Sequence, residues 1–453
     1  MAEVIKIKKG LDIKMNGQAE LIYVKAPRAK TYAIKPGDWH GLTPKIIPKL
    51  CDEVKVGTPI FYDKYHPEVK FCSPVSGILS SINRGERRRI VEVVVEDDGK
   101  DTAESFKQGD PSGMKREEIV ENLLNSGLWP LIRRRPYTVI ARTEEVPKSI
   151  FISAFDTSPL APDYDFLLKD SVDDFQWGVN VLKQLTEGKV HLNLDGRYPS
   201  VRTLSNIKGV EMNHFKGPHP AGNVGIQIHN LDPINKGEVI WVVQPQDVIT
   251  MGRLFKNGKY DPSVVVALTG ARVEKPQYYK TIRGTAVAPI LEKQLKEGDN
   301  RVISGNVLNG KKIDPETGFV GHFDAQVTVI REGNYHELFG WMLPGFKKMS
   351  VSRSFASRWL APNRRFDMDT NFHGGPRPFV MTGEYEKVLP MDIYPMQLLK
   401  AILVNDIDKM EQLGIYEVDE EDLALCEFVC TSKTPVTKIL RDGLRAMRKE
   451  MEE

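Results

Sequence analysis

The pattern of apolar residues changes near Arg116, and this change constrains the fold more than any other feature of the sequence. Before Arg116, strand-like runs such as residues 90–95 are separated by glycine and proline turns, including Lys35-Pro36-Gly37-Asp38. Beyond it, stretches with helical periodicity at residues 116–126 and 170–185 alternate with short apolar runs. Turn-and-strand units predict a small sandwich or barrel, whereas alternating strands and helices predict an open α/β layer. The sequence therefore predicts a multidomain α/β protein.

The length of 453 residues fits several domains, because single domains usually hold about 100–150 residues. A third unit begins near Asp261, where residues 263–270, 288–297 and 301–305 predict a strand, a helix and a strand of a β-grasp-like module. The chain is helical and amphipathic from Pro395. We place the domain limits at residues 1–100, 101–258, 259–312, 313–390 (a β-rich connecting region) and 391–453.

Composition favours an intracellular protein without a membrane span of its own. Hydrophobic content of 41% and charged content of 27% are ordinary for soluble proteins, and a net charge of +2 gives no reason to expect nucleic acid. We see no secretion signal and no apolar run near the ~20 residues of a membrane helix. The four cysteines, Cys51, Cys72, Cys426 and Cys430, suit a reducing compartment better than a disulfide framework. We expect a cytoplasmic protein that reaches a membrane only through a partner.

Known catalytic and cofactor motifs are missing. The histidines show no HExxH, and the sequence has no Walker A loop. The stretch Ala221-Gly222-Asn223-Val224-Gly225 is more typical of a turn than of a nucleotide fingerprint. Cys426 and Cys430 make only half of a metal site, because a tetrahedral ion or cluster needs four ligands.

One basic cluster stands beside aromatic and apolar residues. Arg133-Arg134-Arg135 follows Leu128-Trp129-Pro130-Leu131-Ile132 and precedes Pro136-Tyr137, and Trp39-His40-Gly41 supplies a second aromatic and polar loop. Guanidinium groups beside aromatic surface suit an amphipathic ring compound with polar carbonyls, and suit a protein interface equally well.

Five stretches are specific when they are taken together: Ile7-Lys8-Lys9-Gly10-Leu11-Asp12, Asn125-Ser126-Gly127-Leu128-Trp129, Phe215-Lys216-Gly217-Pro218-His219-Pro220-Ala221-Gly222, Glu337-Leu338-Phe339-Gly340-Trp341 and Asp419-Glu420-Glu421-Asp422-Leu423-Ala424-Leu425-Cys426. With them the chain resembles, almost end to end, the A-subunit family of the bacterial Na⁺-translocating NADH:quinone oxidoreductase. The resemblance implies a barrel-sandwich hybrid of the biotinyl/lipoyl type, a Rossmann-like α/β domain, a β-grasp (SLBB) domain and a C-terminal helical domain like a degenerate helical ferredoxin.

That family is similar to the C subunit of the Rnf complex and to the NADH-binding subunit of complex I, and the chain departs from both. Those relatives hold FMN with a glycine-rich loop, but here the matching stretch from Gly127 to Tyr137 keeps only its first glycine. Aligning the last two cluster cysteines on Cys426 and Cys430 puts Glu420 and Leu423 at the first two positions. We therefore interpret Cys426 and Cys430 as remnants of a lost iron–sulfur site and expect no flavin.

The resemblance implies a peripheral subunit, at the cytoplasmic face of the bacterial inner membrane, of a complex that oxidises NADH, reduces ubiquinone and exports Na⁺. It implies no redox cofactor in this chain, with NADH, flavins and iron–sulfur clusters in partner subunits. The implied partners are quinone and the other subunits of the complex, above all the membrane-embedded quinone and flavin subunit. We hypothesise a quinone site formed by Trp39, His40, Trp129, Arg133, Arg135 and Tyr137. Two alternatives stay open: a soluble flavoenzyme and a purely structural docking subunit.

Overall fold

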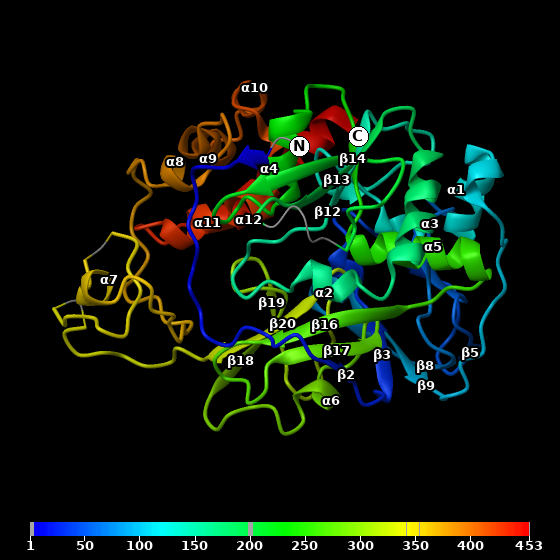
Figure 1. Ribbon diagram of the computed structural model, residues 1–453, viewed down its shortest axis with the longest axis horizontal. Coiled ribbons are helices and arrows are strands. Elements are labelled where there is room, and N and C mark those ends of the chain that lie inside the picture. Colours follow the sequence, from blue (N-terminus) through cyan, green and yellow to red (C-terminus); the bar gives the residue numbers. More distant parts are fainter. Residues whose placement is uncertain (1–3, 198–202, 341, 353, 453) are drawn as a thin grey trace.

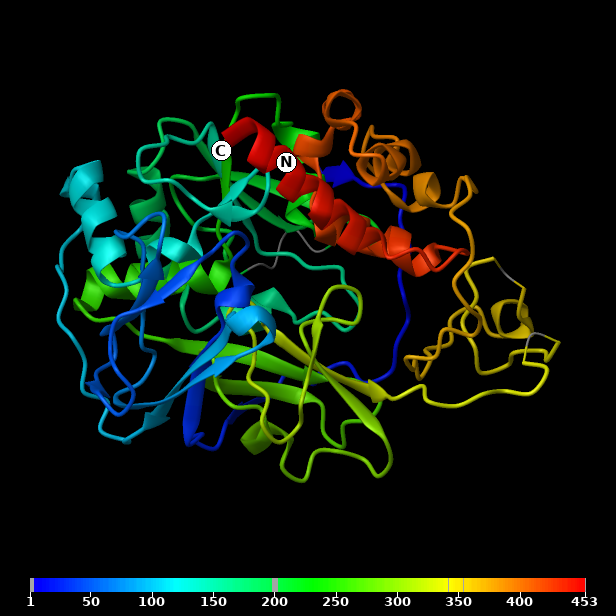
Figure 2. The same cartoon turned by 180° about the vertical axis from the view of Figure 1, so that it is seen from behind.

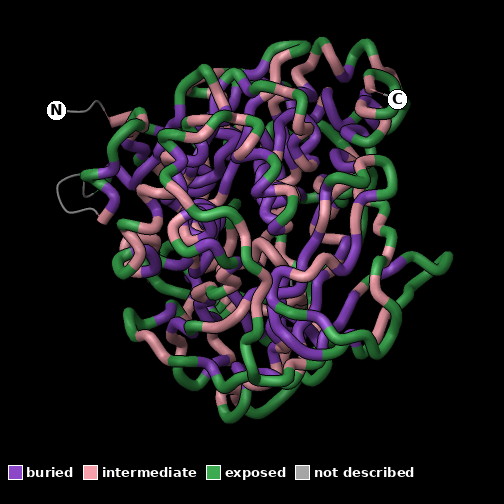
Figure 3. The backbone as a smooth tube through the Cα atoms, turned by 90° about the vertical axis from the view of Figure 1, so that its right-hand side faces the viewer, coloured by how far each residue is buried: buried purple, intermediate pink, exposed green. Residues whose placement is uncertain are grey.

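The computed structural model describes residues 4–197, 203–340, 342–352 and 354–452. These residues form four β-sheets and a helical C-terminal region that packs against the largest sheet (Figure 1). A buried backbone runs through the centre of the molecule, and exposed positions lie mainly at turns (Figure 3).

Two small sheets make the first domain, a four-stranded one in the order β3-β9-β8-β5 and a three-stranded one in the order β4-β6-β7. Both contribute to one apolar core, for example through Phe61 and Val93. Gly77 ends the Ser73–Gly77 turn at a φ of +151°, and a Cβ there would lie 1.8 Å from the Glu96 carbonyl oxygen, so the turn requires glycine. The elements are β3 (Thr31–Ile34), η1 (Pro36–Asp38), β4 (Pro44–Ile46), β5 (Glu53–Val54), β6 (Pro59–Asp63), β7 (Lys70–Cys72), β8 (Gly77–Arg84), η2 (Glu86–Arg88) and β9 (Ile90–Asp97).

The largest sheet is the α/β layer, with the order β1-β14-β13-β12-β15-β10-β11. Strands β14, β13, β12 and β15 are parallel and run 3-2-1-4 in chain order, which is the arrangement of a doubly wound sheet. The order reverses between β12 and β15. The elements are η3 (Pro111–Gly113), α1 (Arg116–Asn125), η4 (Trp129–Leu131), β10 (Arg133–Arg135), β11 (Val139–Ile140), β12 (Ser149–Ser153), α2 (Tyr164–Leu168), α3 (Val172–Lys183), β13 (Lys189–Asp195), β14 (Glu211–Lys216), α4 (Val224–Leu231), β15 (Ile240–Val242) and α5 (Pro245–Asn257).

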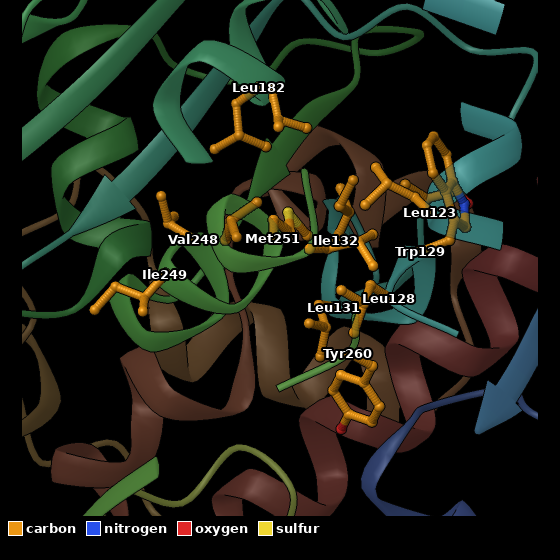
Figure 4. Packing of buried hydrophobic residues seen from close by; sticks show 14 of the residues in the cluster. Leu123, Leu128, Trp129, Leu131, Ile132, Leu182, Val248, Ile249, Met251 and Tyr260 are labelled. Carbon is orange, nitrogen blue, oxygen red and sulfur yellow. The ribbon is translucent and has the colours of Figure 1, made fainter. Parts of the chain in front are cut away.

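Successive side chains of β12 enter different apolar clusters, as the alternation of a strand demands. Ile150 and Ile152 join the cluster that contains α3 and α5, whereas Phe151 packs with Val224 and Ile228 of α4. Helices therefore cover both faces of the sheet, and the packing of α5 against the Trp129 segment is seen in Figure 4.

A six-stranded sheet, β19-β18-β20-β16-β17-β2, forms the β-grasp unit. Its elements are β16 (Ser263–Thr269), β17 (Gln277–Ile282), α6 (Ala288–Leu291), β18 (Asn300–Ser304), β19 (Lys311–Ile313) and β20 (Gln326–Arg331). The expected helix over residues 288–297 ends early, at Leu291. The reason is that Gln294 and Lys296 form backbone hydrogen bonds with residues 274 and 272 instead, at 2.8 and 3.0 Å.

Two short strands near the start of the described chain join sheets that are otherwise built from later segments. Strand β1 (Val4–Lys6) pairs in parallel with β14, and β2 (Tyr23–Lys25) pairs in parallel with β17. Between them, Gly10 passes so close to the turn after β14 that a Cβ would lie 2.1 Å from the His219 carbonyl oxygen. The N-terminal segment thereby ties the α/β layer to the β-grasp sheet.

The helices expected from Pro395 onward pack around a second apolar cluster that includes Leu399, Leu423 and Leu440. Pro435 lies between the last two of them, and the region is broken at several further points. The elements are α8 (Tyr385–Val388), α9 (Pro395–Leu403), α10 (Ile407–Gln412), η5 (Ile415–Glu417), α11 (Glu420–Val429) and α12 (Val436–Glu452).

The region expected to be a β-rich connection differs from that expectation. Its strand β20 belongs to the β-grasp sheet, and the described residues between 332 and 384 contain one helix, α7 (Ala356–Leu360), and no strand. Clusters of Gly, Pro and Asn such as Asn371–Pro378 favour irregular loops over ladders.

Candidate functional site

A cavity of about 120 Å³ opens where β12 and β15 end, at the point where the strand order of the α/β sheet reverses. Open α/β sheets bind ligands at such a point because the connections leave the two strands toward opposite faces, which creates a crevice. The lining comes from the sheet and its loops, from β10, from the loop after β18 and from α11. It includes Arg133, Asp156, Tyr164, His219, Asn306 and Glu421.

Arg133 reaches the cavity from β10, which pairs with β15 and places Arg133 opposite Val242. Its guanidinium lies over the Phe323 ring, with 4.6 Å between the guanidinium carbon and the ring centroid. In the part of the chain that the structure describes, this side chain makes no hydrogen bond or ion pair, and its Nε is buried without a partner. A buried donor left unpaired costs about 1–3 kcal/mol, so an acceptor supplied by a ligand would relieve a real deficit.

His219 lies in the turn after β14 and is 3% exposed. The Thr157 hydroxyl accepts the Gly222 N–H at 2.9 Å and lies 3.2 Å from His219 Nδ1. Because this oxygen already accepts one hydrogen bond, its hydrogen is available to Nδ1, and a neutral ring that accepts at Nδ1 carries its hydrogen on Nε2. Nε2 has no partner among the described residues. Burial lowers the pKa of His219 to about 4, so the ring is a neutral donor at pH 7.

Burial also disfavours the ionised forms of the acidic groups at the cavity. It raises the pKa of the Asp156 carboxyl, although Asp156 accepts the Ser158 N–H at 2.7 Å. It raises the pKa of Glu421 against the opposing charge of Arg135, and it raises the pKa of Tyr164. With Arg133 and His219, the cavity combines hydrogen-bond donors with the apolar side chains of Phe155, Val224, Val242 and Leu308. Such a lining suits a small ring compound that carries acceptor oxygens.

A buried ion cluster holds α11 against β10. Arg135 lies 3.5, 2.6 and 3.2 Å from the carboxylates of Asp419, Glu421 and Asp422. Arg441 of α12 lies 2.7 Å from Asp419. Burial raises the pKa of Asp422 to about 7, and Asp422 still accepts the Asp419 N–H at 3.0 Å. The cluster fixes the position of Glu421 in the cavity wall.

The hypothesised loop residues Trp39 and His40 lie apart from the cavity. Trp39 is buried, donates its Nε1–H to the Pro130 carbonyl at 2.9 Å, and packs against Phe323 with 5.5 Å between ring centroids. Since Phe323 also carries the Arg133 guanidinium, Trp39 supports the cavity through one intermediate ring. His40 Nε2 lies 3.4 Å from Glu420, at the edge of the ion cluster.

Two further hypothesised residues, Trp129 and Tyr137, are buried in the core. Trp129 is fully buried beside Leu123 (Figure 4). It donates its Nε1–H to the Ala141 carbonyl at 2.8 Å and meets Trp241 edge to face. Tyr137 has a φ of +79°, and burial raises its pKa to about 12. Of the six hypothesised residues, Arg133 alone lines the cavity. Arg135 ends the same strand, β10.

The cysteine pair belongs to the core of the helical region. Cys426 and Cys430 are both buried as free thiols, and the Tyr385 hydroxyl donates to Cys430 Sγ at 2.9 Å. Within the described ranges, no group of three or more His, Cys, Asp or Glu side chains is placed to hold a metal ion. Within the same ranges, no helix has the length and apolar character needed to cross a bilayer.

The sequence reasoning missed His219, Asn306 and Asn309 as cavity residues. His219 lies in Phe215–Gly222, one of the stretches that carry the family resemblance. The sequence therefore marked this position but gave no reason to expect a ligand-binding role. Asn306 and Asn309 give no signal, because they meet the α/β layer only in the folded chain.

Family models match three segments of the chain: the NqrA N-terminal barrel-sandwich hybrid domain at residues 5–98, the NqrA second alpha/beta domain at residues 114–260 and the NQRA C-terminal (SLBB) domain at residues 265–314. These matches confirm the barrel-sandwich, α/β and SLBB expectations.

Curated relatives cover nearly the whole chain. The A subunit of the Na⁺-translocating NADH-quinone reductase of Saccharophagus degradans is 40% identical over 99% of this chain and 100% of its own length. The corresponding protein of Neisseria meningitidis serogroup B is 39% identical over the same shares. Among solved structures, an NAD⁺-reducing [NiFe]-hydrogenase in the H₂-reduced state is 11% identical, with a TM-score of 0.40 over 75% of this chain and 62% of that chain. The chain therefore belongs to the NqrA family, the A subunits of the Na⁺-translocating NADH-quinone reductases.

Proposed function

We propose that the chain is a peripheral subunit of a Na⁺-translocating NADH:quinone oxidoreductase complex that takes part in quinone binding and reduction coupled to Na⁺ export. The names of its full-length relatives support membership of such a complex. In this proposal the chain sits on the cytoplasmic face of the inner membrane, held by the membrane-embedded quinone and flavin subunit. NADH oxidation, flavins and iron–sulfur clusters belong to the partner subunits, and the chain alone is not catalytic.

The observation that carries the quinone role is the unpartnered Arg133 guanidinium in the wall of the switch-point cavity. A quinone presents two carbonyl oxygens on a flat ring, and each oxygen becomes more negative as the ring is reduced. Arg133 would donate to one carbonyl oxygen and stabilise that developing charge, and the neutral His219 Nε2–H is a second donor. Phe155 and Leu308 would contact the ring.

The other hypothesised site residues have positioning roles in this proposal. Trp39 packs on Phe323, which carries Arg133, and Arg135 holds Glu421 in the cavity wall. Trp129 and Tyr137 flank β10 at its two ends and His40 contacts Glu420. Changing one of these residues would alter quinone affinity by shifting Arg133 or the cavity wall. It would not remove a direct contact with the quinone.

We further infer that the chain holds no redox cofactor. The stretch that matches the flavin loop of related families forms η4 and β10, and its Trp129, Leu131 and Ile132 side chains fill the core. The C-terminal helices would be a helical ferredoxin domain that has lost its cluster, with Cys426 and Cys430 as remnants. The limits 1–100, 101–258, 259–312, 313–390 and 391–453 remain our proposed domain division.

A calorimetric titration of the purified chain with a short-tail ubiquinone tests the proposal. We expect saturable binding to the wild type and about tenfold weaker binding to Arg133→Gln, which corresponds to the loss of about 1.4 kcal/mol. Arg87→Gln, on the exposed surface of the first domain, is the matched control and should bind like the wild type. Wild-type affinity in Arg133→Gln, or no binding to the wild type, contradicts the proposed site.

The second candidate is a purely structural docking subunit, and the exposed apolar residues between 338 and 381 favour it. Measuring assembly and the apparent KM for quinone in the whole complex separates the two candidate functions. With Arg133→Gln, intact assembly and a raised apparent KM for quinone support the quinone role. Intact assembly with an unchanged KM supports docking alone.

A further inference from the structure

We call residues 338–381 the lobe; its described residues project from the side of the molecule as loops around α7 (Figures 1 and 2). The base of the lobe is anchored by specific contacts. Asn16 donates to the Asp367 carboxylate at 2.7 Å, the Tyr335 hydroxyl donates to Asp369 at 2.6 Å, and the Phe366 N–H bonds to the Lys14 carbonyl at 2.9 Å. The lobe is therefore held in place on the N-terminal segment and the end of β20.

The outer part of the lobe exposes large apolar side chains. Leu338 is 82% exposed, Leu360 is 74% exposed and Phe372 is 67% exposed. Others in the lobe are Phe339, Met342, Leu343, Phe346, Val351, Trp359, Val380 and Met381. Soluble proteins rarely leave large apolar surface in water, and where they do it marks a contact with another molecule.

The composition of the lobe is that of a protein interface. This tenth of the chain holds 6 of its 18 phenylalanines, 4 of its 14 methionines and 2 of its 6 tryptophans. Aromatic residues, Met and Arg are enriched at protein interfaces, whereas Glu and Lys are depleted. The lobe contains no Glu, and five of its seven basic residues are Arg. An anionic lipid surface attracts Lys as well as Arg, so the preference for Arg favours a protein partner.

The charge of the lobe is strongly positive. Its seven Lys and Arg residues against two Asp give +5, whereas the whole chain carries +2. Lys347, Arg358 and Arg365 are exposed, and no described carboxylate lies within ion-pair distance of them. By contrast, Lys348 pairs with Glu337. These exposed cations are available to carboxylates of another molecule.

We propose that the lobe is the surface by which this chain docks on a partner subunit whose face carries apolar pockets rimmed by Asp and Glu. The inference rests on the proposed membership of the complex and names the surface that makes the contact. Apolar side chains such as Phe346 and Leu360 enter the pockets, and Arg358 and Arg365 meet the acidic rim. Hydrophobic burial supplies the affinity, and the charges set orientation and encounter rate.

The test uses cells that produce the whole complex, and it measures the share of this chain that stays with the membrane subunits after solubilisation. The lobe variant is Phe346→Ser with Leu360→Ser. Its control is Ile47→Ser with Leu50→Ser, two exposed apolar residues of the first domain (50% and 53% exposed). We expect at least a tenfold loss of retained chain for the lobe variant and wild-type retention for the control. Wild-type retention of the lobe variant overturns the proposal.

A second variant, Arg358→Glu with Arg365→Glu, tests the acidic rim. We expect reduced retention that is partly restored as ionic strength rises, because salt screens the new repulsion. If this variant is retained like the wild type at low salt, the proposal that Asp and Glu rim the partner's pockets is overturned. Because all four changed side chains are exposed, the isolated variants should melt within a few degrees of the wild type. If the serine variant of the lobe loses retention and also melts early, its result is set aside. The variant Arg358→Glu with Arg365→Glu then decides the proposal alone.

Two further measurements exclude other occupants. Lobe-dependent flotation of the chain with phosphatidylglycerol vesicles, with unchanged retention in the complex, overturns the proposal in favour of lipid. Lobe-dependent self-association in sedimentation, again with unchanged retention, overturns it in favour of a second copy. Quinone titration of the isolated lobe variant keeps the two proposals separate, because the lobe does not line the cavity and quinone affinity should not change.

Discussion

The Arg135 guanidinium lies 2.6 Å from the Glu421 carboxylate, so strand β10 and helix α11 are joined by a partly buried ion pair at the wall of the switch-point cavity. The segment from Trp129 to Arg135 forms η4 and β10, and its last residue anchors the helical domain. The position of the cavity wall therefore depends on contacts between two domains.

Replacing Arg135 by Met should destabilise the protein strongly. The change leaves buried Asp422 and half-buried Glu421 without their cation and Asp419 with Arg441 alone, and breaking a buried pair on one side costs about 3–5 kcal/mol. Urea unfolding at pH 7 measures this cost. Arg87→Met, at an exposed site, should change the free energy of unfolding by no more than about 0.5 kcal/mol. A similarly small effect for Arg135→Met would mean that the cluster is solvated.

His219 should make stability fall as the pH falls. Its folded-state pKa of about 4 lies below the ordinary value of 6.5, so the unfolded chain takes up the proton first. The contribution of the neutral ring is complete above about pH 6.5 and is lost as the pH falls toward 4, by up to about 3 kcal/mol. His219→Gln should flatten the change in unfolding free energy between pH 7 and pH 4.5. The exposed-site control His336→Gln should keep the wild-type profile.

Elements with strong local patterns could be predicted from the sequence. The β-branched residues of Ser149–Ser153 and Ile90–Asp97 form strands because their side chains fill cores on the expected faces. Strands β1 and β2 could not be predicted in their sheets, since three-residue strands carry no periodicity and their partners lie more than 200 residues away. The same limit applies to the helix at Ala288–Leu291, which tertiary hydrogen bonds shorten.

The candidate site shows the same division. Arg133 was predictable because a guanidinium beside aromatic residues signals recognition, and it lines the cavity. The same aromatic pattern was ambiguous for Trp129, since a tryptophan next to a basic run serves a core equally well. His219 could not be assigned, because its free Nε2 depends on Thr157, which lies 62 residues away.

Replacing Gly178 by Ala should disrupt the packing of α3 on α5. A Cβ at Gly178 would lie 2.0 Å from the Val248 carbonyl oxygen, and backbone on both sides must move to relieve that contact. Overpacking of this kind costs about 1–3 kcal/mol, which thermal unfolding detects as a lower Tm. Gly113→Ala is the matched control, because its Cβ would meet no atom within 4 Å and should leave the Tm nearly unchanged. Equal effects of the two changes would show that α3 and α5 separate easily.

The cysteines offer a direct check on the interpretation of a lost cluster. Cys51 is exposed, whereas Cys72, Cys426 and Cys430 are buried, and burial raises the pKa of Cys426 well above its usual range. A buried thiol is out of reach of a disulfide reagent. One thiol should therefore react rapidly in the native protein, and all four should react after unfolding in urea. Incubation with ferrous iron and sulfide should leave the wild type as colourless as Cys426→Ser with Cys430→Ser. A brown product with stoichiometric iron, lost in that double variant, would show that the helical domain still assembles a cluster.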